Sequence, residues 1–215
     1  MQIKLILSLI LTGALTTQAA LYTSSPNAVI PDNNPNGYVN TIGVSGEGAV
    51  LQSVNVLLNV SGGYNGDLYA YLTYNGTTVT LLNRVGTGGG NTFGYADTGF
   101  NVALSDSGTA DFHNYQSHSP TYNGSGQLLG TWQPDSGGTT FGSAYQNMNP
   151  NGTWAIFFAD LSADDQGTLV SWSLDITAVP EPVNVALALF GAIWVGIVSI
   201  RYACRKRSVT EVSYP

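Results

Sequence analysis

The chain has 215 residues, of which 9% are charged, 11% are aromatic and 26 are glycine. Between Ala20 and Ala178, eleven acidic residues stand against a single basic one, Arg84, which gives that stretch a net charge of −10. This charge excludes nucleic-acid binding, because affinity for a phosphate backbone comes mainly from Lys and Arg. The single cysteine, Cys204, excludes an intramolecular disulfide and a cysteine-based zinc site.

The first residues, MQIKLILSLILTGALTTQAALYTSS, predict a secretory signal peptide over residues 1–19. Lys4 precedes an apolar run, and small residues, Thr17 and Ala19, occupy the two positions that signal peptidase reads. We expect this peptidase to cleave between Ala19 and Ala20 and the remainder to be exported. The alternative, a strand or a buried helix, agrees less well with this order of charge, apolar run and small residues.

Residues 20–178 predict an all-β domain. Apolar and polar residues alternate in several short segments separated by turn residues, and the pair Asn75-Gly76 is typical of a tight hairpin. The alternation places these side chains on inward faces: Val54, Val56, Leu58, Val60, Leu68, Ala70, Leu72, Tyr74, Val79, Leu81, Trp154, Ile156, Phe158, Val170, Trp172, Leu174 and Ile176. Short antiparallel strands with one buried face pack as a sandwich or barrel. Residues 86–151 are rich in Gly, Ser, Asn and Tyr, and we expect long loops there with a few short strands. The alternative is a linker between two domains, but scattered apolar and aromatic residues from Phe93 to Met148 favour a segment that folds back onto the same core.

Four stretches within residues 30–177 resemble the P domain, or homo-B domain, of subtilisin-like proprotein convertases. They are IPDNNPNG, VNVLLNVSGGYNGDLYAYLTYNGTTVTLLNRVG, GTWQPDSGGTTFGSAYQNMNPNGTW and NPNGTWAIFFADLSADDQGTLVSWSLDIT. The motif positions are Ile30, Pro31, Asp32, Asn33, Gly66, Asp67, Leu68, Leu72, Gly76, Thr77, Gly152, Thr153, Trp154, Asp160, Gly167, Leu169, Trp172 and Leu174. The resemblance implies a jelly-roll-like antiparallel β-sandwich. It also implies a module without catalytic residues that stabilises a protease.

The residues themselves give little support to catalysis. His113 and His118 lie in DFHNYQSHSP, where solvated loop histidines are expected, and no Gly-x-Ser-x-Gly nucleophile elbow occurs. Asp97, Asp106 and Asp135 each begin an Asp-Thr/Ser-Gly tripeptide like those of aspartic proteases, but in Gly/Ser-rich surroundings such tripeptides are ordinary turns. We therefore expect a protein that is not an enzyme.

The acidic segment DLSADDQG is the best candidate binding site. Asp160, Asp164 and Asp165 lie within six residues, and Asp67 joins them if the loops at one end of the sandwich gather. Ca²⁺ prefers several oxygen ligands of this kind, so the segment predicts a structural Ca²⁺ site. The P-domain resemblance adds to this expectation, since some members of that family hold Ca²⁺. The alternative is a solvated hairpin loop in an acidic protein.

The apolar run 183–200 predicts a transmembrane helix, because it would rise about 27 Å, close to the thickness of a bilayer core. A basic cluster follows it, made up of Arg201, Arg205, Lys206 and Arg207. The positive-inside rule places this cluster and the tail 208–215 in the cytoplasm, with the acidic domain outside the inner membrane.

The box Val179-Pro180-Glu181-Pro182 precedes this run, and residues 179–207 together resemble the PEP-CTERM sorting signal of Gram-negative bacteria. The resemblance implies processing by the membrane protease exosortase and a connection with exopolysaccharide. One departure is the tail SVTEVSYP, which is longer than is usual after the basic cluster. The alternative is a plain C-terminal anchor whose prolines end a strand and begin a helix.

These observations predict a non-catalytic structural, adhesive or binding domain that is sorted to the cell envelope or the exopolysaccharide matrix. Its expected partners are an extracellular polysaccharide or an envelope protein. The candidate sugar-stacking side chains are Tyr64, Tyr95, Tyr115, Tyr122 and Tyr145, and the alternative is that these tyrosines pack at the edge of the core. The alternative function is that of an accessory P domain assisting a separately encoded subtilisin-like serine protease.

Overall fold

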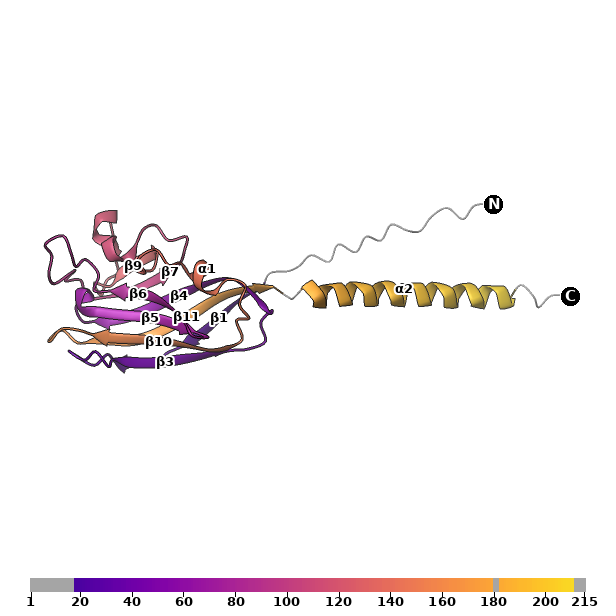
Figure 1. Ribbon diagram of the computed structural model, residues 1–215, viewed down its shortest axis with the longest axis horizontal. Helices are drawn as coiled ribbons and strands as arrows, with labels where there is room; N and C mark the ends of the chain where they lie inside the picture. Colours follow the sequence, from indigo (N-terminus) through magenta and orange to yellow (C-terminus); the bar gives the residue numbers. More distant parts are fainter. Residues whose placement is uncertain (1–17, 180–181, 211–215) are drawn as a thin grey trace. The chain divides into compact units, whose positions relative to one another are not determined.

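The computed structural model describes residues 18–179 and 182–210. The chain divides into two compact units, Thr17–Val179 and a second unit that contains the residues from Pro180 onward. The first unit is a sandwich of two β-sheets (Figure 1), so the predicted all-β sandwich is confirmed. The predicted signal peptide lies outside the described residues except for Gln18 and Ala19.

The larger sheet has seven strands in the order β1-β11-β4-β7-β9-β8, with β2 paired to β11. These strands are β1 (Gln18–Ser24), β2 (Ala28–Val29), β4 (Val50–Gly62), β7 (Gly99–Leu104), β8 (Thr121–Tyr122), β9 (Leu128–Trp132) and β11 (Gly167–Val179). The pairing of β7 with β9 is parallel, and the other pairings of this sheet are antiparallel. The prediction of a purely antiparallel sandwich is therefore wrong for that one pair.

The smaller sheet has four strands in the order β3-β10-β5-β6, all antiparallel. Its strands are β3 (Tyr38–Val44), β5 (Leu68–Tyr74), β6 (Thr77–Asn83) and β10 (Gly152–Asp160). The hairpin between β5 and β6 turns at Asn75 and Gly76, as the sequence predicts, with φ angles of 48° and 78°. Positive φ at both central residues matches the right-handed twist of the two strands.

Apolar side chains from both sheets form one continuous core, and the predicted inward faces are confirmed with one exception. Trp154 and Trp172 are among the largest fully buried side chains. The exception is Val170, which is half-buried while Leu169 is fully buried. A bulge in β11 lies between Leu169 and Ser171, and the extra residue shifts the inward and outward alternation by one position.

Residues 86–151 contain the few short strands that the sequence predicts, β7, β8 and β9. They also hold the 3₁₀ segment η2 (Phe112–His118) and the short helix α1 (Phe141–Tyr145), which the sequence does not predict. A further 3₁₀ turn, η1 (Asn65–Asp67), precedes β5. The segment contributes these buried aromatic side chains to the core: Phe100, Phe112, Tyr115, Trp132, Phe141 and Tyr145.

The second unit contains helix α2, Pro182–Thr210. Within the part of the chain that the structure describes, no helix is both long and apolar enough to cross a membrane, so the predicted span over 183–200 is not supported. Pro180 and Glu181 of the predicted sorting box lie outside the described residues, as does the end of the predicted tail, 211–215.

Candidate functional site

Asp97 lies just before β7 and links two later segments, η2 and β8. Its Oδ2 atom accepts hydrogen bonds from the Tyr115 hydroxyl at 2.8 Å, the Gln116 amide at 2.7 Å and the Tyr122 hydroxyl at 3.2 Å. Burial, followed by the Asp97 charge, raises the pKa of Tyr122 to about 12. Asp97 is therefore engaged as an acceptor that fixes η2 and β8.

Asp106 binds the first turn of the short helix α1, whose N-cap residue is Thr140. Its two carboxylate oxygens accept hydrogen bonds from the backbone N–H groups of Phe141 and Gly142, each at 2.7 Å. The first N–H groups of a helix have no partner within the helix, and a carboxylate there satisfies both hydrogen bonding and the helix dipole. Asp106 thus attaches α1 to the end of β7.

Asp135 pairs with His113, whose Nδ1 lies 2.8 Å from the Asp135 Oδ2 atom. The other ring nitrogen, Nε2, lies 2.8 Å from the carbonyl oxygen of Thr87. Burial lowers the pKa of His113, but the Thr87 carbonyl and Asp135 outweigh it and leave this pKa raised. The expectation of a solvated histidine is wrong at His113, because two distant loops enclose it, and correct at His118, which is exposed.

The three Asp-Thr/Ser-Gly carboxylates share no hydrogen-bond partner with one another. An aspartic-protease site needs two carboxylates close enough to share a proton. Asp97, Asp106 and Asp135 are instead each committed to a separate structural network. Asp106-Ser107-Gly108 lies in a turn, as the sequence interpretation expects, whereas Asp97-Thr98-Gly99 leads directly into β7.

The acidic segment after β10 gathers with two other loops at one end of the sandwich. The backbone N–H of Asn34 donates to the carbonyl of Asp160 at 2.8 Å, and the N–H of Leu161 donates to the carbonyl of Asp67 at 3.0 Å. The N–H of Asp164 donates to the Asp32 carboxylate at 3.3 Å. Sequence reasoning missed Asp32 as a member of this group, although the residue belongs to the quoted IPDN motif.

Asp160 is the centre of this acidic end. Its side chain is fully buried, Oδ1 accepts a hydrogen bond from the N–H of Ser162 at 3.2 Å, and Oδ2 has no partner. Burial, together with the negative charges of Asp67, Asp32 and Asp165, raises the pKa of Asp160 to about 6, against the opposing effect of the Ser162 N–H. An unpaired oxygen in a buried carboxylate is costly unless a proton or a cation neutralises it.

Arg84 provides the one positive charge close to this end. Its guanidinium lies 3.8 Å from the Asp67 carboxylate, and its Nε donates to the carbonyl of Gly66 at 3.3 Å. Burial raises the pKa of Asp67, while Arg84 opposes the rise. One partly exposed guanidinium does not balance the surrounding carboxylates.

The negative charge of these residues and the unpaired Oδ2 atom of Asp160 agree with a structural Ca²⁺ site. The number of carboxylates that converge on one point does not. Among the described residues, no three acidic or histidine side chains come close enough together to hold a metal ion. Of the predicted ligands, Asp160, Asp67 and Asp165 interact electrostatically, whereas Asp164 takes part through its backbone N–H. A bound Ca²⁺ would need backbone or water oxygens to complete its coordination.

The expectation that the loop tyrosines are exposed is wrong for two of the five. Tyr115 and Tyr145 are fully buried, because the segments that carry them fold onto the core. Tyr95 packs against Tyr115 edge-on, with ring centroids 4.8 Å apart. The hydroxyl of Tyr64 reaches the carbonyl of Gly94 at 3.4 Å, and Tyr122 is 40% exposed with its hydroxyl on Asp97.

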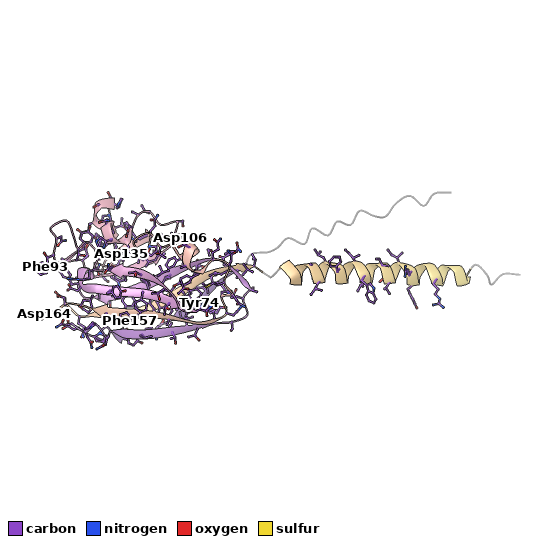
Figure 2. The ribbon with its side chains drawn as sticks, in the orientation of Figure 1. Tyr74, Phe93, Asp106, Asp135, Phe157 and Asp164 are labelled. Carbon is purple, nitrogen blue, oxygen red and sulfur yellow. The ribbon has the colours of Figure 1, made fainter. Side chains whose placement is uncertain are left out.

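A second aromatic group, unnoticed in the sequence, lies on the outer face of the smaller sheet. Tyr71 and Phe157 are opposite each other on β5 and β10, and their rings stack with centroids 4.8 Å apart and planes 14° apart. The Phe157 ring also contacts Gly37, where an added Cβ would lie 2.6 Å from the Cζ atom. Tyr71 thus covers one face of the Phe157 ring, whose position on the smaller sheet is marked in Figure 2.

The predicted processing residues lie at the ends of two paired strands. Ala19 and Ala20 belong to β1, opposite Thr177 and Ile176 of β11. Val179 is the last residue of β11.

The remaining residues of the sorting signal belong to the second unit. Pro182 is the first residue of α2, and the predicted basic cluster lies further along the same helix. Arg201 and Arg205 are exposed, while the side chains of Lys206 and Arg207 lie outside the described part of the chain.

Comparison with known proteins gives a distant likeness only. No family model and no curated protein matches the chain. The crystal structure of the *Aeromonas sobria* serine protease in complex with its chaperone (ORF2) matches with 14% identity and a TM-score of 0.45, and that of the *Aeromonas sobria* serine protease with 14% identity and a TM-score of 0.43. Each match covers 76% of this chain and 27% of the other, so this chain spans about a quarter of the length of the matched chains.

Proposed function

We propose that this chain is a non-catalytic, exported accessory domain of the P-domain type that assists a separately encoded subtilisin-like serine protease. The observation that carries the proposal is that three motifs of the P-domain resemblance, far apart in sequence, meet at one end of the sandwich. The IPDN motif bonds to Asp160 through Asn34, which directly follows it, and the Gly-Asp-Leu motif bonds through Asp67 to Leu161. The quoted motifs thus act together as one structural unit.

A non-catalytic role is supported by the state of the candidate catalytic side chains. The hydrogen bonds of the candidate side chains hold loops in place, and this applies to Asp97, Asp106, Asp135 and His113. A general base or nucleophile needs a free position within hydrogen-bond distance of a substrate. His118 is exposed, but none of its contacts links it to a serine or a carboxylate among the described residues.

A protein partner is favoured over a polysaccharide by the aromatic side chains. Two of the five candidate tyrosines, Tyr115 and Tyr145, are buried and cannot stack on a sugar. In the pair Tyr71 and Phe157, stacking already covers one face of each ring. Fewer exposed ring faces are therefore left for a polysaccharide than the sequence suggests.

Export and sorting remain part of the proposal. Their support is the order of charge, apolar run and small residues at the N-terminus and the Pro-Glu-Pro box with its basic cluster near the C-terminus. The intact mass of the mature protein, taken from membranes and from culture fluid of its host, tests both. A species that begins at Ala20 and ends near Val179–Pro182 is expected outside the cell. Recovery of an unprocessed chain alone would overturn this part.

The accessory function is tested by thermal unfolding of a subtilisin-like protease from the same host, with its active serine replaced, in the presence and absence of this chain. We expect the protease Tm to rise when this chain is added, because a ligand that binds only the folded state stabilises it. A Trp154→Ala variant, whose core is disrupted, is the control and should give no rise. An unchanged protease Tm with the native chain would refute the accessory function.

A further inference from the structure

Phe93 is an exposed aromatic side chain on a well-fixed loop. Its side chain is 68% exposed, and the residue sits between β6 and β7, at the end of the sandwich that also carries Asp164 (Figure 2). Large exposed aromatic side chains are typical anchors of protein–protein interfaces. A single exposed apolar residue needs no explanation by itself, so the loop that carries it has to be considered.

The loop is held by hydrogen bonds at its base and at its tip. The N–H of Tyr95 donates to the carbonyl of Val85 at 3.0 Å, which closes the base. At the tip, the side chain of Asn91 donates to the carbonyl of Gly94 at 3.0 Å and accepts from the N–H of Gly94 at 3.1 Å. The imidazole of His113 fixes Thr87 as described above.

The backbone of Phe93 is locked against the neighbouring loop. Gly66 lies so close that an added Cβ would be 2.3 Å from the carbonyl oxygen of Phe93. The exposed Phe93 ring therefore projects from a fixed backbone position. A loop that is already fixed does not have to be ordered on binding, which lowers the entropy cost of using Phe93 as an anchor.

The surroundings of Phe93 combine one more apolar side chain with negative charge. Leu161 is 37% exposed, and its N–H is bonded to Asp67, the residue after Gly66. Asp164 and Asp165 follow in exposed positions of the same loop. The guanidinium of Arg84 is already directed at Asp67 and Gly66.

We propose that this end of the sandwich, termed the Phe93 end and comprising Phe93, Leu161, Asp32, Asp164 and Asp165, is a docking surface. Its partner is a folded protein that offers an apolar pocket for Phe93 within a rim of Lys or Arg side chains. Apolar burial supplies affinity, while the carboxylates select a basic rim and speed association. A second copy of this chain does not fit, because its domain carries a net charge of −10 with one basic residue.

The test uses the full chain in its native host, with the photoreactive amino acid p-benzoylphenylalanine at position 93. The control has the same amino acid at Thr78, an exposed residue of β6 near the hairpin at the other end of the sandwich. We expect a discrete protein adduct from position 93 that is absent from position 78. Equal adducts from both positions, an adduct between two copies of this chain, or a polysaccharide adduct would overturn the proposal.

The adduct protein is then purified and its binding to the native chain measured. We expect Phe93→Ala to weaken binding at least about tenfold, as for a buried aromatic anchor. Replacing Asp164 and Asp165 together by Asn should reduce the association rate and its dependence on salt. Leu21→Ala, at an equally exposed apolar position on β1, is the matched control and should leave binding unchanged. Equal effects of Phe93→Ala and Leu21→Ala would overturn the proposal.

This inference rests on the proposed function only for the class of partner. A specific adduct with a protein that is not a protease would leave the docking surface intact and refute the accessory function. A protease whose Tm rises equally with the native chain and with the Phe93→Ala variant would refute the docking surface and leave the accessory function intact.

Discussion

His113 and Asp135 form a 2.8 Å ion pair between loops that lie 22 residues apart in the sequence. The second imidazole nitrogen faces the carbonyl of Thr87, so both ring nitrogens have acceptors as partners. A neutral imidazole donates only one hydrogen bond, whereas the imidazolium donates two. The geometry therefore favours charged His113 in the folded state, and Asn83 supports the arrangement by donating its backbone N–H to the same Asp135 oxygen.

Replacing His113 by Gln should lower the free energy of unfolding by about 1–3 kcal/mol at pH 6. The pKa of His113 is raised in the folded state, so its contribution is complete below the unfolded pKa of about 6.5 and is lost as pH rises through the folded pKa. The difference between wild type and His113→Gln in urea unfolding should thus shrink from pH 6 to pH 9. His118→Gln is the control, and a difference that grows with pH would contradict the ion pair.

Replacing Asp160 by Asn should stabilise the domain at pH 7.5 in the presence of a chelator. The folded carboxyl has a pKa of about 6, above its ordinary value of 3.8, so the folded state loses stability as pH rises from about 4 through 6. The amide is uncharged and retains an acceptor for the N–H of Ser162. Thermal unfolding between pH 4 and pH 8 should show the gain of Asp160→Asn only toward the upper end. Asp164→Asn, at an exposed position, is the control.

Addition of Ca²⁺ at pH 7.5 should raise the Tm of the wild-type domain. A cation at the unpaired Oδ2 of Asp160 offsets the cost of burying that charge, and occupied sites stabilise the fold by mass action. Titration to about 10 mM covers the affinities of extracellular sites. Asp160→Asn should abolish the response, and Mg²⁺ should give a smaller one. An equal Ca²⁺ response in the Asn variant would exclude a site at Asp160.

Replacing Asp106 by Ala should cost about 1 kcal/mol, because two N–H groups in the first turn of α1 lose a charged acceptor while the N-cap Thr140 remains. The change leaves the N–H groups of Phe141 and Gly142 without their acceptors. Asp106→Asn should recover only part of the loss, since its single amide oxygen can accept from one of the two N–H groups. Denaturant unfolding measures both changes. Full stability of Asp106→Ala would show that this contact contributes nothing to folding.

Removal of residues 180–215 should leave the Tm of the domain unchanged. The last residues of β11, Ala178 and Val179, still pair with Leu51 and Val50 of β4 in the shortened chain. A chain that ends at Ser173 instead loses Leu174 and Ile176, both fully buried, and should not fold. Circular dichroism of the two truncated chains distinguishes these outcomes. Loss of folding on removal of 180–215 would show that the sandwich depends on the second unit.

The local sequence pattern was sufficient for the strands that alternate regularly. Side chains such as Leu68, Leu72 and Ile156 face the core because successive side chains of a strand point to opposite faces. The Asn75-Gly76 turn could also be predicted from the local sequence, because few residue pairs adopt two positive φ angles. The bulge beside Val170 was not readable, because a bulge is set by the pairing of β11 with β4.

The sequence by itself determined the all-β class and most of the core, because these depend on the period of each strand. It also determined the acidic character of the domain, because that depends on composition alone. Only the tertiary structure decided which loop residues meet. It buried Tyr115 and Tyr145, enclosed His113 between two loops, joined Asp32 to the acidic end and left Phe93 outside. The physical reason is that contacts between loops depend on the relative positions of strands far apart in the chain, such as the parallel pair β7 and β9, which no local pattern encodes.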